Sequence, residues 1–300
     1  MARQSPRSTF RILVNPASGG GKALHRVEPV ARILRDTGAE VRVVHSLGIE
    51  HSVEEVALAA KNGEQMVACG GDGMLASVAA AVIDNGVSLG VIPSGRGNDF
   101  ARQLRLLEAS PQETAHTLLE GEASPVDVIR VADEDGHRVV LGSVYAGVDS
   151  LASELVNRAH WLPGSLQYPY AAVRSLLTYK PTRYTVTVDG STVVVEAFSV
   201  VVANSGYYGK GMHIAPHATV DDGQLDVIVI PKASRLKLIR LMPKLYDGTH
   251  IEHEQVLSFR GASVQVSSKD RVAAFGDGEP LMDLPVSAEV LPGGLSVLLP

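Results

Sequence analysis

Cysteine is almost absent from this sequence of 300 residues, since Cys69 is the only one. One cysteine cannot form an internal disulfide, and it cannot build a cysteine-based zinc site. Its scarcity fits a reducing compartment such as the cytoplasm. Among the ten histidines, His213 and His217 are four residues apart, but the glycine and proline around them rule out a helical zinc-binding face. We therefore assign no zinc.

A long apolar run is also missing. The basic first residues lead only into the short apolar stretch 12–14 before Asn15 and Pro16, which is too short for a signal peptide. No stretch approaches the roughly 18 uncharged apolar residues of a membrane-spanning helix. We therefore expect a cytoplasmic chain, and any contact with a membrane would be transient and peripheral.

Positive charge is in deficit, with 27 Lys and Arg against 33 Asp and Glu and a net charge of −6. A nucleic-acid-binding chain normally presents a basic face, so we expect no nucleic-acid partner. Net charge does not exclude a local basic patch. The content of 45% hydrophobic and 20% charged residues is typical of a folded globular protein, and the length favours two domains.

The first half of the chain alternates short apolar runs with helical patterns. The strands are predicted at residues 10–14, 41–44, 66–69 and 87–92. Ser52 with Glu55 predicts a capping box at the start of one helix, and Ser110 with Glu113 predicts another. Pro29 indicates a late start or a kink in the first helix. Strands that alternate with helices predict a parallel sheet between helices, an α/β domain.

After about residue 127 the pattern changes to short β-rich runs. Asp135 with Gly136, and Asp189 with Gly190, lie between such runs and predict hairpin turns. Two helical patterns lie between the hairpins. The second half therefore predicts a β-sandwich or layered β-domain with inserted helices.

Glycine-rich turns follow three of the predicted parallel strands, at residues 15–22, 70–73 and 93–102. Glycine lets backbone N–H groups approach a phosphate closely, and open α/β sheets bind ligands at the carboxyl ends of their strands. None of the turns matches the P-loop or the dinucleotide pattern, so a nucleotide site of another kind is predicted. Its candidate residues are Asn15, Ser18, Gly19, Gly20, Gly21, Lys22, Gly70, Gly71, Gly73, Met74, Gly95, Arg96 and Asn98.

Asp72 lies in the second of these turns, between two glycines. An aspartate there can hold a magnesium ion or accept a proton from an attacking hydroxyl. The tetrapeptide alone is equally compatible with a tight strand-to-helix turn in which Asp72 only caps the helix. The presence of two further glycine-rich turns favours phosphate binding.

These segments resemble the diacylglycerol kinase catalytic family, which includes bacterial soluble lipid kinases and is related to sphingosine and ceramide kinases. The matching segments keep the family's order over nearly the whole chain: Asn15-Pro16 with its glycine turn, Gly70 to Gly73, Gly95 with Gly97 to Arg102, Asp127, Gly147 with Asp149, Asn204, Ala215 to Asp226, and Asp277 to Glu279.

The resemblance implies an NAD kinase/diacylglycerol kinase-like fold. Such a fold has an α/β nucleotide-binding domain followed by a β-sandwich, with the active site in the cleft between them. We place the first domain at residues 1–129 and the second at residues 130–292. Residues from about 293 to 300 are expected to pack back on the first domain.

The activity implied by the resemblance is that of an ATP-dependent lipid kinase, which phosphorylates the hydroxyl of a lipid such as diacylglycerol with ATP and Mg²⁺. By resemblance, Asp72, Asp99 and Asp127 hold the catalytic magnesium through a water network, and Arg102 pairs with one of these carboxylates. Either Asp72 or Glu279 would be the base that takes the proton of the lipid hydroxyl. A plain hairpin turn is the structural alternative for Glu279.

A second, structural metal site is implied near residue 222. Asp222 would contribute its carboxylate, and Thr219 and Gln224 would contribute backbone oxygens, a set that suits a hard cation. An ordinary turn before a strand is the alternative.

The sequence departs from the family pattern at the nucleotide turns. Met74 and Arg96 each stand where a threonine is usual, and Ala76-Ser77 replaces a common Asn-Glu pair. Met74 removes a hydroxyl that could contact phosphate, and Arg96 adds a cation. Every carboxylate is retained, which favours an active enzyme.

Residues 151–179 are the candidate lipid-contacting segment. Apolar and aromatic side chains with flanking cations suit an acyl-chain pocket at a membrane interface, but a helix pair covering the β-domain explains them equally well. They are Trp161, Leu162, Leu166, Tyr168, Tyr170, Val173, Leu176 and Leu177, with Arg158, Arg174 and Lys180.

Two alternative functions stay open. NAD kinases also carry Gly-Gly-Asp-Gly after a buried strand, so a kinase of a soluble substrate is one alternative. A lipid- or nucleotide-binding protein with little catalysis is the other, supported by Met74 and Arg96. The acceptor lipid and the oligomeric state are not determined by the sequence, which is compatible with a homodimer.

Overall fold

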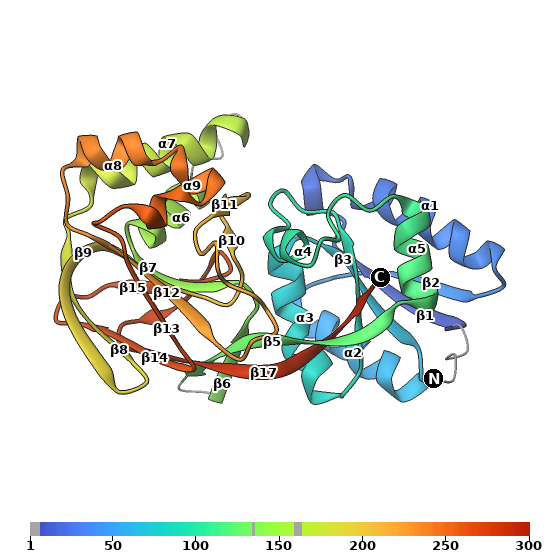
Figure 1. Ribbon diagram of the computed structural model, residues 1–300. Coiled ribbons are helices and arrows are strands. Elements are labelled where there is room, and N and C mark those ends of the chain that lie inside the picture. Colours follow the sequence, from blue (N-terminus) through green and yellow to red (C-terminus); the bar gives the residue numbers. More distant parts are fainter. Residues whose placement is uncertain (1–6, 134–135, 159–163) are drawn as a thin grey trace. The chain divides into compact units, whose positions relative to one another are not determined.

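The computed structural model describes residues 7–133, 136–158 and 164–300. The chain divides into two compact units: Met1–Asp127 with Pro292–Pro300, and Val128–Leu291 (Figure 1). Two strands, β5 (Glu122–Asp133) and β17 (Val286–Leu299), contribute residues to both units.

The first unit contains the predicted parallel sheet. Its strands follow the order β2-β1-β3-β4. Strand β17 lies beside β4, where Val297 pairs in parallel with Leu89 of β4. The strands are β1 (Thr9–Val14), β2 (Glu40–His45), β3 (Gln65–Gly70) and β4 (Leu89–Pro93). The helical elements are η1 (Ser18–Gly20), α1 (Ala23–Asp36), α2 (Ile49–Asn62), α3 (Asp72–Asp84), α4 (Asp99–Gln103) and α5 (Pro111–Glu120).

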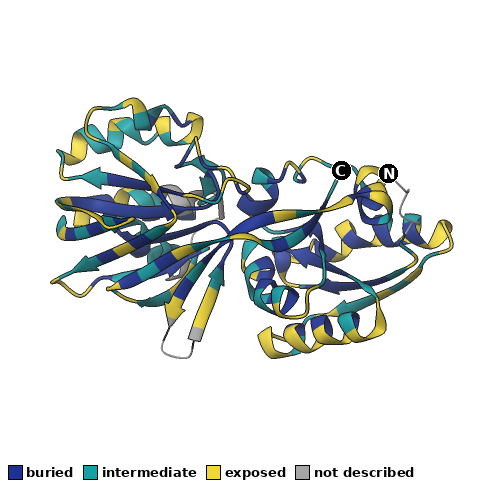
Figure 2. Ribbon diagram, turned by 60° about the horizontal axis from the view of Figure 1, so that its bottom comes forward, coloured by how far each residue is buried: buried dark blue, intermediate teal, exposed yellow. Residues whose placement is uncertain are grey.

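The central strands of this sheet are buried on both faces, as expected for parallel strands between helices (Figure 2). On one side, side chains of β1 pack with the apolar face of α1 and with Leu118 of α5. The core residues shared by β1 and α1 include Phe10, Ile12, Val14, Val27, Val30 and Leu34. This packing fixes the carboxyl ends of β1, β3 and β4, from which the three glycine-rich turns emerge.

One predicted helix start is confirmed and one is wrong. Ser110 Oγ accepts a hydrogen bond from the Glu113 N–H at 3.2 Å, and the Ser110 N–H donates to Glu113 Oε2 at 2.8 Å, which is a complete capping box. Ser52, in contrast, lies inside α2, and its hydroxyl donates to the carbonyl of Gly48 at 2.7 Å. The capping-box pattern failed there because the helix begins one turn earlier and Glu55 is used in an ion pair with Arg11.

Pro29 does not delay the first helix. Helix α1 begins at Ala23 and continues through Pro29 to Asp36, so the expectation of a late start is wrong.

The second unit is mainly antiparallel. Its strands follow the order β16-β15-β7-β9-β8-β14-β17, while β12 pairs with both β9 and β13, and β6 pairs with β5. The strands are β6 (Gly136–Val140), β7 (Ser143–Gly147), β8 (Thr182–Val188), β9 (Ser191–Ala203), β10 (Tyr207–Tyr208), β11 (Met212–His213), β12 (Leu225–Pro231), β13 (Leu257–Gly261), β14 (Ser263–Ser268), β15 (Ala273–Gly276) and β16 (Glu279–Asp283). The helical elements are α6 (Val148–Arg158), α7 (Gly164–Thr178), α8 (Arg235–Leu241), α9 (Lys244–Asp247) and η2 (Thr249–Glu252).

Strand β9 packs against a hydrophobic cluster on each of its two faces. Val200 and Val202 pack into one hydrophobic cluster, and Val201 and Ala203 pack into another. Successive side chains of a strand point to opposite faces, so β9 is covered on both sides. The predicted hairpin between β8 and β9 is confirmed, with Asp189 and Gly190 both at positive φ.

None of the helices formed by the described residues is both long and apolar enough to cross a lipid bilayer.

Candidate functional site

The three glycine-rich turns of the first unit meet at the carboxyl ends of their strands. A methyl group on Gly19 in the first turn would lie 2.3 Å from the carbonyl oxygen of Ser94 in the third. A methyl group on Gly95 in the third turn would lie 2.4 Å from the Cα atom of Gly71 in the second. The turns can approach this closely only because these positions have no side chain.

Asn98 gives the third turn its shape. It is buried and has a φ of 53°, a conformation that asparagine tolerates better than most residues. Its Oδ1 accepts the N–H of Gly95 at 2.7 Å, and its Nδ2 donates to the carbonyl of Gly95 at 3.1 Å. The side chain of this predicted nucleotide-binding residue therefore closes the turn on itself.

Two predicted catalytic carboxylates converge on Gly97. A methyl group on Gly97 would lie 3.1 Å from Asp72 Oδ2 and 3.3 Å from Asp99 Oδ2. Asp72 is the first residue of α3, and its Oδ1 accepts the N–H of Phe100 at 3.1 Å. Asp72 is half-buried and Asp99 is buried. Two acidic side chains beside glycine-rich turns form a donor set that fits magnesium, because this ion commonly uses one or two carboxylates together with waters and phosphates.

Asp127 is held in another way. It is 3% exposed, and its Oδ1 accepts the N–H of Gly293 at 2.7 Å, so it joins β5 to the part of β17 that belongs to the first unit. Within the described ranges, no three His, Cys, Asp or Glu side chains lie close enough to bind a metal ion together. The water-mediated role of Asp127 stays a prediction, as does the pairing of Arg102 with a carboxylate.

Asn15 holds the first turn in place. The N–H of Asn15 donates to the carbonyl of Cys69 at 3.0 Å, and Asn15 Oδ1 accepts the N–H of Ala17 at 3.0 Å. Gly20, Gly21 and Lys22 are left exposed. Three of the six residues predicted to bind the nucleotide through this turn are therefore accessible, while Ser18 is buried.

Cys69 lies under the turns and is fully buried. Burial raises the pKa of its thiol to about 11, so it stays protonated near neutral pH. Its Sγ lies 3.7 Å from Ser94 Oγ. Cys69 is thus a packing residue of the site and not a nucleophile.

Met74 and Arg96, the two departures from the family pattern, have different surroundings. Met74 is buried, and its side chain fills the space beside Gly70, where an added methyl group would lie 2.6 Å from the Met74 sulfur. Arg96 is exposed on the third turn. The first departure therefore changes packing under the turn, while the second changes the charge on its surface.

In the second unit, the Asp277-Gly278 pair forms the hairpin turn between β15 and β16, with φ values of 50° and 92°. The Asp277 carboxylate accepts three backbone N–H groups, from Leu141 at 2.7 Å, Gly142 at 2.8 Å and Ser143 at 3.2 Å. Sequence reasoning assigned no role to Asp277, although it lies in a motif with Glu279. The hairpin interpretation is right for the turn, and it leaves Glu279 exposed as the first residue of β16. The catalytic role of Glu279 stays a prediction.

Asp149 belongs to a family motif for which the sequence indicated no role. Its carboxylate accepts hydrogen bonds from the hydroxyls of Ser199 and Tyr208, the latter at 3.2 Å. Burial raises the pKa of Asp149, and burial followed by the nearby Asp149 charge raises the pKa of Tyr208. The signal available in the sequence was the Gly147-x-Asp149 pattern, in which Gly147 has a φ of +120°.

Asp222, the predicted ligand of a structural metal, is already in contact with a cation. Arg260 donates to Asp222 Oδ2, which also accepts the Thr219 hydroxyl at 2.7 Å, while Oδ1 accepts the Gln224 N–H at 3.0 Å. Arg260 Nε lies 3.4 Å from Oδ2 of the buried Asp226. A metal ion would have to share Asp222 with Arg260 or displace it.

The candidate lipid-contacting segment is described in part. Trp161 and Leu162 lie outside the described residues, and so do the side chains of Arg158, Leu166 and Tyr168. Of the others, Leu176 is buried, while Val173 and Leu177 are exposed on α7.

Two family models match the chain, one to each part. A diacylglycerol kinase catalytic domain matches residues 9–131, which contain all three glycine-rich turns. A YegS C-terminal NAD kinase β-sandwich-like domain matches residues 142–299, more than half of the chain. The chain belongs to the diacylglycerol kinase family. The resemblance inferred from its motifs is thereby confirmed, and so is the α/β domain followed by a β-sandwich.

Relatives of the family match almost end to end. A diacylglycerol kinase of Mycobacterium tuberculosis (strain ATCC 25618 / H37Rv) is 30% identical over 292 residues, which cover 96% of this chain and 94% of that protein. A diacylglycerol kinase of Bacillus subtilis (strain 168) is 26% identical over 274 residues, covering 90% and 89%.

A crystal structure from Bacillus anthracis strain Sterne, provisionally described as a diacylglycerol kinase, superposes with a TM-score of 0.76 and 20% identity over 98% of this chain and 97% of that one. At this identity the match establishes the shared fold alone.

Proposed function

We propose that this chain is an ATP-dependent lipid kinase that phosphorylates the hydroxyl of a lipid such as diacylglycerol. The observation that carries the proposal is the convergence of Asp72 and Asp99 on Gly97, at the point where three glycine-rich turns meet. The relatives are named diacylglycerol kinases, and these names support a lipid as the acceptor.

The turns would hold the phosphates of the nucleotide. Phosphoryl transfer depends on positioning and on neutralising charge more than on covalent help from the protein. Gly20 and Gly21 offer accessible backbone, and the exposed Lys22 and Arg96 offer positive charge. These groups would bind and orient the nucleotide against the carboxylates.

Asp72, Asp99 and Asp127 would hold the magnesium ion through a water network, as the family resemblance implies. When bound, magnesium would neutralise charge on the phosphates. Since Asp72 Oδ1 is engaged by the N–H of Phe100, its Oδ2 is the oxygen that faces Gly97. The N–H of Phe100, at the start of α4, therefore sets which carboxylate oxygen of Asp72 is presented to the ligand.

The lipid hydroxyl must lose a proton as it attacks the phosphate. Asp72 through its Oδ2, or Glu279 of the second unit, would accept this proton. Glu279 is exposed, so its carboxylate is accessible. An exchange of Glu279 for Gln distinguishes the two, because it removes the base only if Glu279 has that role.

The test is transfer of labelled γ-phosphate from ATP and Mg²⁺ to a panel of detergent-dispersed lipids, with NAD as a parallel soluble acceptor. The inactivating variant is Asp72→Asn, which keeps an oxygen for the Phe100 N–H but removes the charge. Its matched control is Asp84→Asn, an exposed aspartate at the other end of the same helix.

We expect a labelled lipid from the wild type and from Asp84→Asn, and a loss of at least about a hundredfold in Asp72→Asn. Label in NAD alone would move the chain to the kinases of soluble substrates. Nucleotide binding with no labelled acceptor would favour a binding protein, and full activity of Asp72→Asn would refute its assignment.

A further inference from the structure

Two segments of the second unit contain no acidic residue. Between Glu154 and Asp189 the sequence has four Lys or Arg and no Asp or Glu, and between Asp226 and Asp247 it has five and none. Helix α7 lies in the first of these segments and helix α8 in the second. In a chain with a net charge of −6, this is a local excess of positive charge.

The two segments lie side by side in the fold. Arg235, the first residue of α8, donates through Nε to the carbonyl of Leu176 at 3.1 Å and through Nη2 to the carbonyl of Tyr179 at 3.1 Å. Helices α7 and α8 are neighbours in Figure 1. Their cations therefore belong to one surface of the second unit.

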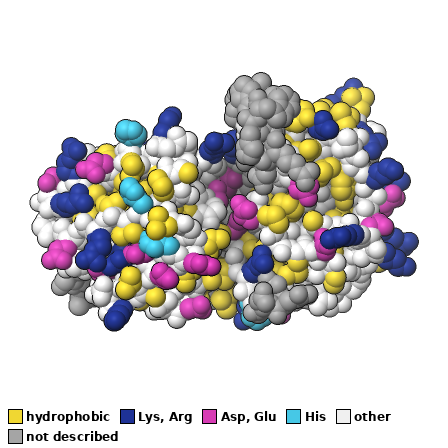
Figure 3. Space-filling view, turned by 180° about the vertical axis from the view of Figure 1, so that it is seen from behind, with side chains coloured by type: hydrophobic (Ala, Val, Ile, Leu, Met, Phe, Trp, Pro, Cys, Tyr) yellow, Lys and Arg dark blue, Asp and Glu magenta, His cyan; other side chains and the backbone are white. Residues whose placement is uncertain are grey.

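Large apolar side chains are exposed on the same helices. Val173 and Leu177 of α7 are 38% and 53% exposed, and Leu236 of α8 is 59% exposed. Helix α8 buries no residue fully, and Tyr246 on the neighbouring α9 is 60% exposed. Figure 3 shows hydrophobic and basic side chains together at the upper right, where this end of the second unit lies.

Three of the surface cations are not neutralised by carboxylates. Arg174 donates to the hydroxyl of Tyr170 at 2.8 Å, and in the described part of the chain Arg174, Lys180 and Arg240 form no ion pair with Asp or Glu. Two other cations do face a carboxylate: Lys232 pairs with Glu196 at 3.0 Å, and Lys244 lies near Asp247. The available positive charge thus lies beside the exposed apolar groups.

We propose that the exposed faces of α7 and α8, with Lys244 and Tyr246 of α9, dock on the anionic surface of a lipid bilayer. Basic side chains are attracted to anionic headgroups, and neighbouring leucine, valine and tyrosine side chains gain by entering the interface. A nucleic-acid backbone would use the cations but would leave the apolar groups in water. The inference rests on the proposed lipid kinase activity only for its purpose, which is to bring the enzyme to its substrate.

The test is co-sedimentation of the full chain with vesicles, without nucleotide, comparing phosphatidylcholine with phosphatidylcholine that contains phosphatidylglycerol. We expect binding to the anionic vesicles only, weakening as salt is raised. The triple variant Arg174→Gln, Arg240→Gln, Lys244→Gln should bind roughly a hundredfold more weakly, at about fivefold for each cation. All three side chains are exposed, so folding should be retained, and the unfolding midpoint checks this.

The matched control removes three positive charges at exposed positions outside α7, α8 and α9. Its substitutions are Arg32→Gln, Lys61→Gln and Lys269→Gln. It should bind as the wild type does. A second variant, Leu177→Gln with Leu236→Gln, should lose the part of the binding that persists at high salt. Equal loss in the control set, unchanged binding of the triple variant, or binding to soluble heparin but not to vesicles would each overturn the proposal.

Vesicle binding and phosphate transfer are measured separately, so the two proposals fail separately. A chain that binds anionic vesicles through α7 and α8 but labels no lipid would refute the kinase proposal and leave the docking surface standing. A chain that labels micellar lipid but does not bind anionic vesicles would refute the docking surface and leave the kinase proposal standing.

Discussion

Gly71 and Gly95 belong to different turns, yet a methyl group on Gly95 would lie 2.4 Å from the Cα atom of Gly71 and 2.8 Å from Asn98 Oδ1. The neighbouring atoms include backbone, which cannot move aside as a flexible side chain can. Gly95→Ala should therefore push the turns apart. We expect a destabilisation of about 1–3 kcal/mol together with weaker binding of ATP, measured by urea unfolding and by nucleotide titration.

Gly73→Ala is the matched control, since Gly73 has open space around it and lies in the first turn of α3. Alanine favours a helix over glycine, so this variant should be as stable as the wild type or more so by up to about 1 kcal/mol. Equal stability of both variants would show that the close approach of the turns is unimportant.

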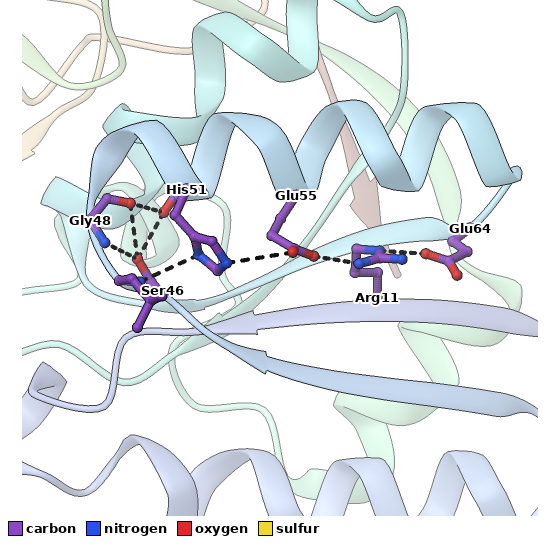
Figure 4. Close-up of polar contacts among 8 residues, drawn as sticks. Arg11, Ser46, Gly48, His51, Glu55 and Glu64 are labelled. Atoms are coloured by element: carbon purple, nitrogen blue, oxygen red, sulfur yellow. Dashed lines mark hydrogen bonds and ion pairs between the residues drawn. The ribbon is translucent and has the colours of Figure 1, made fainter.

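Arg11 of β1 anchors a buried ion-pair network with Glu55 of α2 and with Glu64, which precedes β3 (Figure 4). Its side chain is 4% exposed and contacts Glu55 and, at 2.5 Å, Glu64, while His51 lies 3.6 Å from Glu55. Arg11→Leu removes the buried cation that contacts both of these largely buried carboxylates. We expect a loss of about 3–5 kcal/mol in the free energy of unfolding, measured with urea.

Arg42→Leu provides the comparison, because Arg42 is 62% exposed and lies 3.8 Å from the same Glu64. An exposed pair of this kind contributes at most about 1 kcal/mol. If Arg11→Leu cost no more than Arg42→Leu, the buried network would not stabilise the first unit.

Asp149 should make the stability of the second unit depend on pH. Its pKa is raised by burial above the ordinary value of 3.8, so the unfolded chain ionises first as pH rises. The wild type therefore loses stability from about pH 4 upward until the folded-state pKa is passed, and Asp149→Asn does not lose this part. We expect the difference in unfolding free energy between the two proteins to shift in favour of the variant as the pH rises above about 4.

Asparagine can accept only one of the hydrogen bonds that Ser199 and Tyr208 donate, which gives the variant a constant offset of about 1 kcal/mol but no pH dependence. The exposed Asp84→Asn controls for the change in net charge. Parallel curves for the wild type and Asp149→Asn would contradict the raised pKa.

Arg260 and a metal ion would compete for Asp222. Arg260→Gln removes the cation that faces both Asp222 and the buried Asp226, whose pKa burial raises. If Thr219, Asp222 and Gln224 bind a metal as the family resemblance implies, added Mg²⁺ should raise the melting temperature of this variant more than that of the wild type. The rise should vanish when Asp222→Asn is added. No effect of Mg²⁺ on any of these proteins would rule out a structural metal site here.

Much of the first unit could be predicted from local patterns. The strands at β1, β3 and β4 and the glycine turns that follow them were evident, because apolar periodicity and turn glycines are local properties of the chain. The capping box at Ser110 was correct for the same reason. The one proposed at Ser52 was wrong because Glu55 pairs with Arg11, a residue 44 positions away.

The family motifs identified Asp72, Asp99 and Glu279 but did not show which distant contacts hold these motifs in place. The motif that contains Glu279 is an example, since the carboxylate of its Asp277 accepts the N–H of Leu141 from 136 positions away. Nothing in the Asp-Gly dipeptide distinguishes a simple turn from one that anchors a second strand. Pairings of this length depend on how strands are placed beside one another.

The sequence by itself therefore determined the fold class, the family and the three turns, because strand and helix periods and turn chemistry act over a few residues. Only the tertiary structure decided that Asp72 and Asp99 face Gly97, that Arg260 neutralises Asp222, and that α7 and α8 bring their cations onto one surface. The physical reason is that burial and charge pairing depend on which distant segments pack together, and that choice is made by the whole core.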